Sequence, residues 1–239
     1  MGERAAEDRK VEGSIPSRGI FMIEKYILKE LSPADSFTIM NGICGLFSIF
    51  FILEGEKHVS MIFILLAVLA DGMDGIMARR YGGYLGRYMD EFSDIVSFLI
   101  APILFVYVVY DVTISPIFLF SSALFLITGM LHLVAYHLGK KNFFIGITTP
   151  ASAIILVTIS YLSFPPYSII FSMILLSILM ISPLPYPRIE KHFAIIAAII
   201  IIFAMSGIKE FVVILLLSTA LYAAAGPFYL KIRDSSRNL

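Results

Sequence analysis

The 239-residue chain has a single cysteine and no excess of charge of either sign. Cys44 cannot form a disulfide within the chain, so we expect it to be a small packing residue. Lys and Arg number 18 and Asp and Glu number 18, which leaves no basic field to attract a nucleic acid. We also find no internal repeat, no soluble domain and no cleavable signal peptide. These absences exclude a disulfide scaffold and argue against a nucleic-acid partner.

Apolar residues, in contrast, are abundant. They make up 59% of the chain, charged residues make up 15%, and the mean hydropathy is +0.89, far from the averages of soluble domains. A helix needs roughly 20 apolar residues to span a hydrocarbon core. The composition therefore predicts an all-α integral membrane protein with about eight transmembrane helices. The expected helices are 36–54, 58–79, 88–110, 116–138, 147–164, 167–185, 192–208 and 210–230.

The positive charges predict the orientation. When loops are assigned alternately to the two sides, every Lys and Arg except Lys57 and Lys209 falls on one side. By the positive-inside rule, that side and both termini face the cytoplasm, which places the protein in the cell membrane. We expect a mobile tail over 1–19 and an amphipathic interfacial helix over 20–34. A six-helix core over 35–191 and two additional helices with a tail over 192–239 complete the expected organisation.

Four aspartates stand out in this apolar setting. Asp71 and Asp74 are three apart near the end of the second helix, and Asp90 and Asp94 are four apart at the start of the third. A glycine-containing turn between these helices lets them approach closely and antiparallel, so the carboxylates converge just below the cytoplasmic interface. A charge at mid-bilayer costs roughly 2.5 to 3.5 kcal/mol, so such a cluster indicates an ion or substrate site. Oxygen ligands suit Mg²⁺ or Mn²⁺, and two such ions are typical of displacement at phosphorus.

The same residues resemble a family signature. Asp71-x-x-Asp74-Gly75-x-x-Ala78-Arg79, then Gly86-x-x-x-Asp90-x-x-x-Asp94, is similar to the pattern of the CDP-alcohol phosphotransferases, with a shorter turn between its halves. The resemblance implies that Asp71, Asp74 and Asp90 bind two divalent metal ions. It also implies that Asp94 completes the metal site, and as a loosely held ligand Asp94 is the best candidate general base. The implied contacts to CDP come from Gly75, Ala78, Arg79 and Gly86. Asn41, like Thr38, is either a further nucleotide contact or part of an interhelical hydrogen bond.

Three further stretches resemble the phosphatidylserine synthases within that family. Residues 144–153 are similar to F-x-G-x-P-x-P-A-A-A, and residues 179–187 to L-M-V-S-x-x-P-Y-P. Residues 35–45 are similar to the start of the first helix, with Asp35 in place of an asparagine. The resemblance implies transfer of a phosphatidyl-type group from a CDP-linked lipid, CDP-diacylglycerol or CDP-archaeol, to the hydroxyl of L-serine. The products would be a phosphatidylserine-type lipid and CMP, and the enzyme would be a homodimer.

Several residues are candidates to bind the acceptor, each with a structural alternative. They are Arg80, His132, Lys140, Lys141 and Arg188. The positive-inside rule already accounts for the basic ones, and His132 suits an intramembrane hydrogen bond equally well.

Other functions remain open at this point. The same chemistry with glycerol phosphate or inositol phosphate as acceptor would require a dedicated arginine cluster, and the loops offer few spare basic residues. A cation transporter would also use intramembrane aspartates, yet it would have no need of Gly75, Ala78, Arg79 or Gly86. Structural salt bridges from Arg79, Arg80 and Arg87 could offset three of the aspartates, but the ordered spacing would then be a coincidence.

Overall fold

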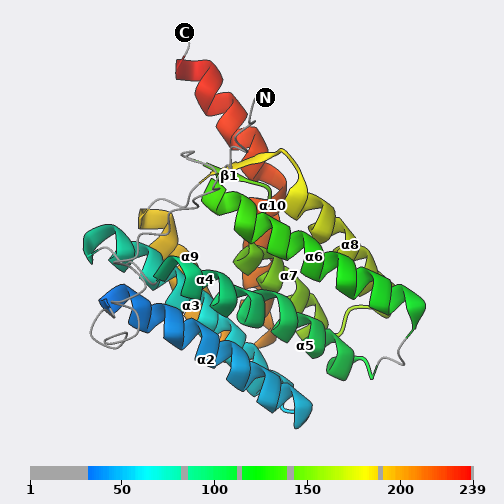
Figure 1. Cartoon of the computed structure of the whole chain (residues 1–239). Coiled ribbons are helices and arrows are strands. Elements are labelled where there is room, and N and C mark those ends of the chain that lie inside the picture. Colours follow the sequence, from blue (N-terminus) through cyan, green and yellow to red (C-terminus); the bar gives the residue numbers. More distant parts are fainter. Residues whose placement is uncertain (1–31, 82–85, 112–114, 139–142, 188–190, 238–239) are drawn as a thin grey trace, which may run out of the picture. The chain divides into compact units, whose positions relative to one another are not determined.

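The computed structural model describes residues 32–81, 86–111, 115–138, 143–187 and 191–237 (Figure 1). The chain divides into two units, residues 1–31 and residues 32–239. The expected tail over 1–19 and nearly all of the expected interfacial helix over 20–34 thus lie outside the described residues.

The described residues form eight helices, as the sequence predicts. The first two are α2 (Pro33–Leu53) and α3 (Lys57–Tyr81). The third runs without a break through α4 (Gly86–Asp94), the π-helix η2 (Ile95–Ile100) and α5 (Ala101–Val109). The remaining five are α6 (Pro116–Leu138), α7 (Thr149–Tyr161), α8 (Pro166–Ile181), α9 (Lys191–Ala204) and α10 (Lys209–Arg237).

Five stretches of these helices are long and apolar enough to cross a membrane. They are Pro33–Leu53, Lys57–Met77, Met89–Val109, Pro116–Ala135 and Lys209–Tyr229. Helices α7, α8 and α9 are apolar but shorter. The protein is therefore an all-helical membrane protein, and the expected break at Lys209 does separate the last two helices.

Helix α2 begins at a capping box. The Ser32 N–H donates to Asp35 Oδ2 at 2.7 Å, and the Asp35 N–H donates to Ser32 Oγ at 3.2 Å. Pro33 fits this first turn because its missing N–H would have no intrahelical partner there. Asp35, which stands where the resembled segment has an asparagine, thus caps its own helix.

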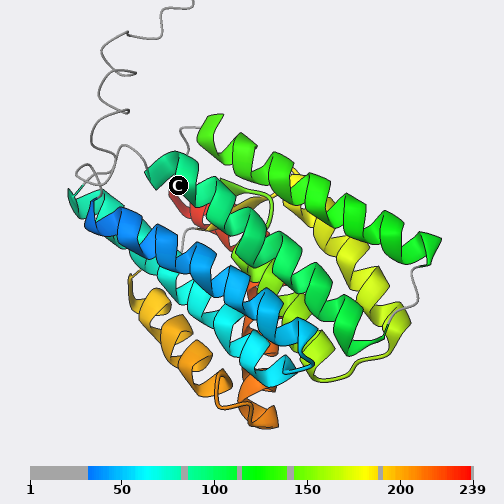
Figure 2. The ribbon, with the colours of Figure 1, turned by 60° about the horizontal axis from the view of Figure 1, so that its bottom comes forward.

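Helix α2 packs between α3 and the α4–α5 helix (Figure 2). The close approach to η2 depends on Gly45, where a Cβ atom would lie 2.8 Å from Ser97 Cα. A contact that short would force the backbone apart, so glycine is required at this crossing.

Two short strands interrupt the helices, and the hydrophobic pattern did not predict them. β1 (Phe143–Ile145) pairs antiparallel with β2 (Pro185–Pro187), with Phe144 opposite Tyr186. The expected helix over 167–185 therefore stops at Ile181, where Pro183 and Pro185 cannot supply helical N–H donors. The pairing brings together residues 144–153 and 179–187, two segments singled out by sequence.

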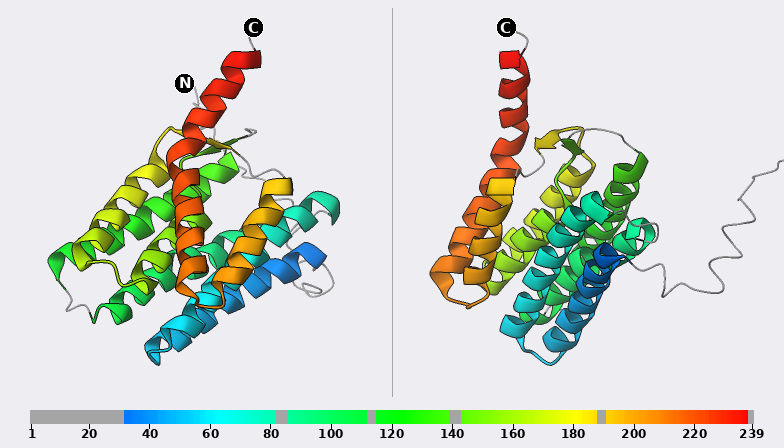
Figure 3. Two further views of the ribbon diagram at one scale, coloured as in Figure 1. Left: turned by 180° about the vertical axis from the view of Figure 1, so that it is seen from behind. Right: turned by 90° about the vertical axis from the view of Figure 1, so that its left-hand side faces the viewer.

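The sheet and the aspartates lie at one end of the bundle, which we call the acidic end. Successive helices run in opposite directions, so α3, α6 and α8 end there and α4, α7 and α9 begin there (Figure 1). Helix α10 runs along α7, passes the two strands and continues beyond them (Figure 3). The acidic end thus combines helix ends, the sheet and the last helix.

Candidate active site

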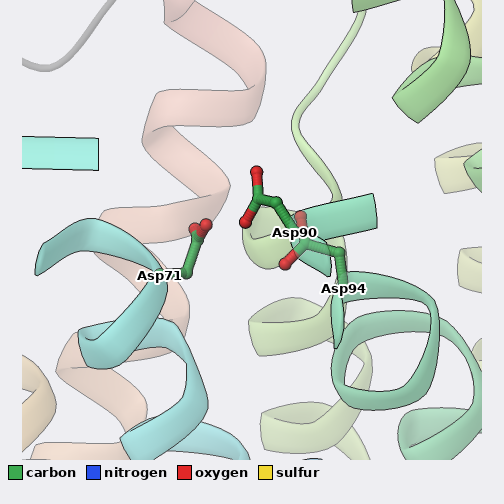
Figure 4. Close-up of side chains that lie close together, drawn as sticks. All are labelled: Asp71, Asp90 and Asp94. Atoms are coloured by element: carbon green, nitrogen blue, oxygen red, sulfur yellow. The ribbon is translucent and has the colours of Figure 1, made fainter. Parts of the chain in front are cut away.

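Three of the four aspartates converge at the acidic end. Asp71 comes from α3, and Asp90 and Asp94 come from α4. One carboxylate oxygen from each lies within 4.8 Å of the other two, and the side chains point toward one another (Figure 4). The predicted convergence of these three carboxylates is thus present in the structure.

Asp74 lies beside this cluster. Its side chain is 7% exposed, and Thr38 Oγ1 of α2 donates to Asp74 Oδ2 at 2.9 Å. Its charge interacts with that of Asp90. Thr38 therefore holds the fourth carboxylate next to the other three.

Asp94 is held in the same way by a second residue of α2. It is 6% exposed, and Asn41 Nδ2 donates to Asp94 Oδ1 at 2.8 Å. From the sequence, Asn41 and Thr38 could form either nucleotide contacts or interhelical hydrogen bonds. In the structure both form interhelical hydrogen bonds. Asn41 Oδ1 is buried and has no hydrogen-bond partner among the described residues, so it is available to a donor group of a ligand.

Two serines attach α4 and η2 to the backbone of α2. Ser93 Oγ donates to the Thr38 carbonyl at 3.0 Å, and Ser97 Oγ donates to the Asn41 carbonyl at 2.9 Å. Sequence reasoning missed both serines. The signal was their spacing of four in an apolar span, since small polar residues at such spacing join helices in membranes.

The π-helix begins immediately after Asp94. The Ala101 N–H bonds to the Val96 carbonyl, five residues back, where an α-helix would use the carbonyl four residues back. Single π turns inside α-helices are frequent at functional sites. Here the wider turn changes the helix register between Asp94 and the packed Phe98 and Leu99.

The electrostatics of the cluster favour a bound cation. The charges of Asp71, Asp90 and Asp94 repel one another, with Asp94 buried and the other two partly exposed. Hard divalent ions prefer oxygen ligands, so these residues fit a metal ion. Among the residues that the structure describes, a Cβ atom on Gly75, one residue after Asp74 on α3, would meet nothing within 4 Å.

The structure places the other predicted residues as follows. Gly86 is the first residue of α4, while the side chains of Ala78, Arg79 and Arg80 on α3 are outside the description. Lys140, Lys141 and Arg188 lie outside the described residues. His132 is buried, and its Nδ1 donates to the Met180 carbonyl at 2.9 Å, so it completes the end of α8.

Fold and site together define a membrane-embedded enzyme whose acidic cluster could bind divalent metal ions. Residues 31–223 match the sequence model of the CDP-alcohol phosphatidyltransferase family, and the chain belongs to this family, which uses divalent metals. The match extends through α9 into α10, beyond the signature motifs.

Three curated relatives are similar to this chain over most of its length. The chain is 34% identical over 201 residues to a CDP-diacylglycerol–serine O-phosphatidyltransferase of Methanocaldococcus jannaschii, covering 82% of this chain and 94% of the relative. It is 34% identical over 180 residues to the archaetidylserine synthase of Methanothermobacter thermautotrophicus, covering 71% and 75%. It is 32% identical over 161 residues to a CDP-diacylglycerol–serine O-phosphatidyltransferase of Bacillus subtilis, covering 66% and 90%.

Asn41→Ala should reduce turnover because it leaves Asp94 free to rotate away from the cluster. Loss of one residue that orients a metal ligand typically costs about 10- to 100-fold. The measurement is kcat for CMP release, alongside the melting temperature in detergent. Ser48→Ala is the matched control, because it removes another buried interhelical bond of α2, the 2.9 Å contact with Ser60, far along the helix. Equal kcat losses in the two variants would contradict a specific role for Asn41.

Proposed function

We propose that this protein transfers a phosphatidyl-type group from a CDP-linked lipid to the hydroxyl of L-serine and releases CMP. The observation that carries the proposal is the pairing of β1 (Phe143–Ile145) with β2 (Pro185–Pro187), which brings the segments 144–153 and 179–187 together at the acidic end. These are the segments that resemble the phosphatidylserine synthases, and the similar curated proteins are serine transferases by name. The donor lipid is CDP-diacylglycerol or its ether counterpart CDP-archaeol.

The chain's own residues suit the chemistry. The serine oxygen attacks the lipid-side phosphorus, the bond from that phosphorus to the CMP oxygen breaks, and CMP leaves with that electron pair. Asp94 accepts the serine proton, and Asn41 keeps its carboxylate aimed at the reacting group. The space beside Gly75, which is open among the described residues, would admit the nucleotide to the surface of α3. The family resemblance implies that Ala78, Arg79 and Gly86 also contact the nucleotide.

Asp71, Asp74, Asp90 and Asp94 are the proposed ligands of two divalent cations, Mg²⁺ or Mn²⁺. When bound, these ions would neutralise the negative charge of the diphosphate and of the attacking oxygen. Thr38 and Asn41 hold Asp74 and Asp94 in place before any ligand binds. The scaffold is therefore organised by α2 rather than by the ligand alone.

The proposed membrane arrangement has all eight helices crossing and the acidic end in the cytoplasm. An even number of crossings returns the C-terminus to the side of the N-terminus, where nearly all Lys and Arg lie. The lipid then enters sideways from the bilayer, and serine arrives from the water at the acidic end. A homodimer, which the family resemblance implies, is part of the same proposal.

The proposal predicts which acceptor supports CMP release. The purified protein in detergent would be given CDP-diacylglycerol or CDP-archaeol, with Mg²⁺ or Mn²⁺, and one acceptor at a time. We expect CMP only with L-serine, and not with glycerol 3-phosphate or inositol phosphate. Release with one of those phosphates would overturn the serine assignment and keep the metal chemistry. Failure with every donor and acceptor, together with Mn²⁺ flux into vesicles, would favour a transporter instead.

A further inference from the structure

Helix α10 contains a proline that leaves one of its carbonyl groups without a helical donor. In an α-helix the Ala223 carbonyl accepts from the N–H of residue 227, but that residue is Pro227 and has none. The Tyr186 hydroxyl of β2 donates to the Ala223 carbonyl at 3.0 Å. The strand thus supplies the hydrogen bond that the helix lacks.

A second set of contacts joins the same two elements. The Tyr222 hydroxyl on α10 donates to the Pro187 carbonyl at 3.3 Å, and the rings of Tyr186 and Tyr222 have centroids 5.7 Å apart. Gly226 allows the approach, because a Cβ atom there would lie 3.0 Å from the Tyr186 ring and 3.2 Å from Pro187. Tyr186 is fully buried in this contact.

The sheet is in turn hydrogen-bonded to the helices that flank it. The Gly146 N–H donates to the Leu184 carbonyl at 2.8 Å, and the Ile147 N–H donates to the Leu179 carbonyl at 3.1 Å. Gly146 has a φ of +82°, and a Cβ atom there would run into the end of α8 at the Met180 carbonyl. The start of α7 and the end of α8 are therefore fixed to the strand that α10 holds.

We propose that Tyr186, Tyr222 and Pro227 are positioning residues. Their contacts join α10 to β2 and so hold the β1–β2 sheet in place beside the path of the acceptor substrate. The inference rests on the proposed function, since it assigns a role to the last helix in that reaction. The donor's signature residues lie on α3 and α4, whereas the sheet joins the two segments that set this branch apart. Loosening the sheet should therefore weaken acceptor binding and spare donor binding.

The Tyr186 hydroxyl can keep its hydrogen bond to the Ala223 carbonyl over a wide range of pH. Burial raises the pKa of Tyr186, so the hydroxyl remains protonated and remains a donor over the working range of pH. Its acceptor, the Ala223 carbonyl, has no helical donor because Pro227 lacks an N–H. The contact therefore does not compete with the helix's own hydrogen bonds.

A double-mutant cycle between Tyr186→Phe and Pro227→Ala tests the inference. Tyr186→Phe removes the hydroxyl and should raise KM for serine by about fivefold, the expected effect of losing one hydrogen bond. Pro227→Ala restores an N–H that can bond the Ala223 carbonyl within the helix, so it should raise the same KM. In the Pro227→Ala background, Tyr186→Phe should then add little, while KM for the CDP-linked lipid stays unchanged throughout.

Tyr229→Phe on the same helix is the matched control, because Tyr229 is exposed and its hydroxyl makes no hydrogen bond among the described residues. Tyr222→Phe provides a second variant if Tyr186→Phe folds poorly, and it should show the same selective rise. A purely structural contact would lower the melting temperature and leave both KM values unchanged, which would overturn the inference. Equal effects of Tyr186→Phe in both backgrounds would overturn it as well. If the wild type prefers another acceptor, the serine assignment fails, and the cycle is measured with that acceptor.

Discussion

Asp71→Asn is expected to abolish transfer while making the metal-free protein more stable. The change keeps the shape of the side chain and removes one of three charges whose oxygens lie within 4.8 Å. Relief of that repulsion is worth about 1 to 3 kcal/mol at an intermediate dielectric, which raises the melting temperature by several degrees. Loss of a charged group at the proposed reacting centre should lower kcat by about 10³-fold.

Divalent ions should make the wild type more stable than Asp71→Asn, the reverse of the order expected without metal. A ligand that binds only the folded state stabilises it, so Mn²⁺ should raise the melting temperature of the wild type. The increase should be much smaller for Asp71→Asn. Melting curves with EDTA and with Mn²⁺, together with CMP release, therefore report the metal site by two independent readouts.

Asp111→Asn is the control for the loss of a charge. Asp111 is exposed at a turn after α5 with a φ of +44°, a conformation that asparagine also tolerates. Neither its activity nor its response to Mn²⁺ should change. Retention of more than a tenth of the wild-type rate by Asp71→Asn would contradict the assignment of Asp71 as a ligand.

The arrangement of helices was largely predictable from sequence, because length and hydropathy mark each one. The expected span 116–138 coincides with α6, and the weak break at Lys209 is where α10 begins. The errors lie where backbone hydrogen bonds decide the outcome. The segment after Ile181 was assigned to a helix by its apolar residues, but its prolines direct it into β2, whose partner strand lies about forty residues earlier in the chain.

The acidic site was predictable for a different reason. Carboxylates in an apolar span are costly and therefore indicate a site, and their spacing on two helices joined by a glycine-containing turn predicted that Asp71, Asp90 and Asp94 lie together. The hydrogen bonds that orient them were not predictable, since Thr38 and Asn41 could equally contact a nucleotide. The π turn after Asp94 was not predicted either, nor was the close approach of η2 to α2 at Gly45.

Gly45→Ala should disable the enzyme through that close approach. The new methyl group would lie 2.8 Å from Ser97 Cα, so the backbones of α2 and η2 must separate. Asn41, one turn before Gly45, would then move away from Asp94, and its carbonyl would lose Ser97. Overpacking of this kind costs about 1 to 3 kcal/mol of stability. We expect kcat to fall by about 100-fold or more, because the displacement misplaces Asp94, the proposed proton acceptor.

Gly42→Ala, one turn away on the same helix, separates this effect from a general intolerance of α2 to larger residues. The three atoms nearest to its methyl group would all belong to Ser93, with Oγ at 3.0 Å and the backbone Cα no closer than 3.7 Å. A side-chain rotation can relieve that contact, so the loss of kcat should be several-fold rather than 100-fold. CMP release and melting temperature would be measured for both variants. Similar losses in the two would show that the spacing between α2 and η2 at Gly45 does not control Asp94. A selective loss in Gly45→Ala would instead support the proposal that α2 positions the Asp94 carboxylate by backbone packing as well as through Asn41.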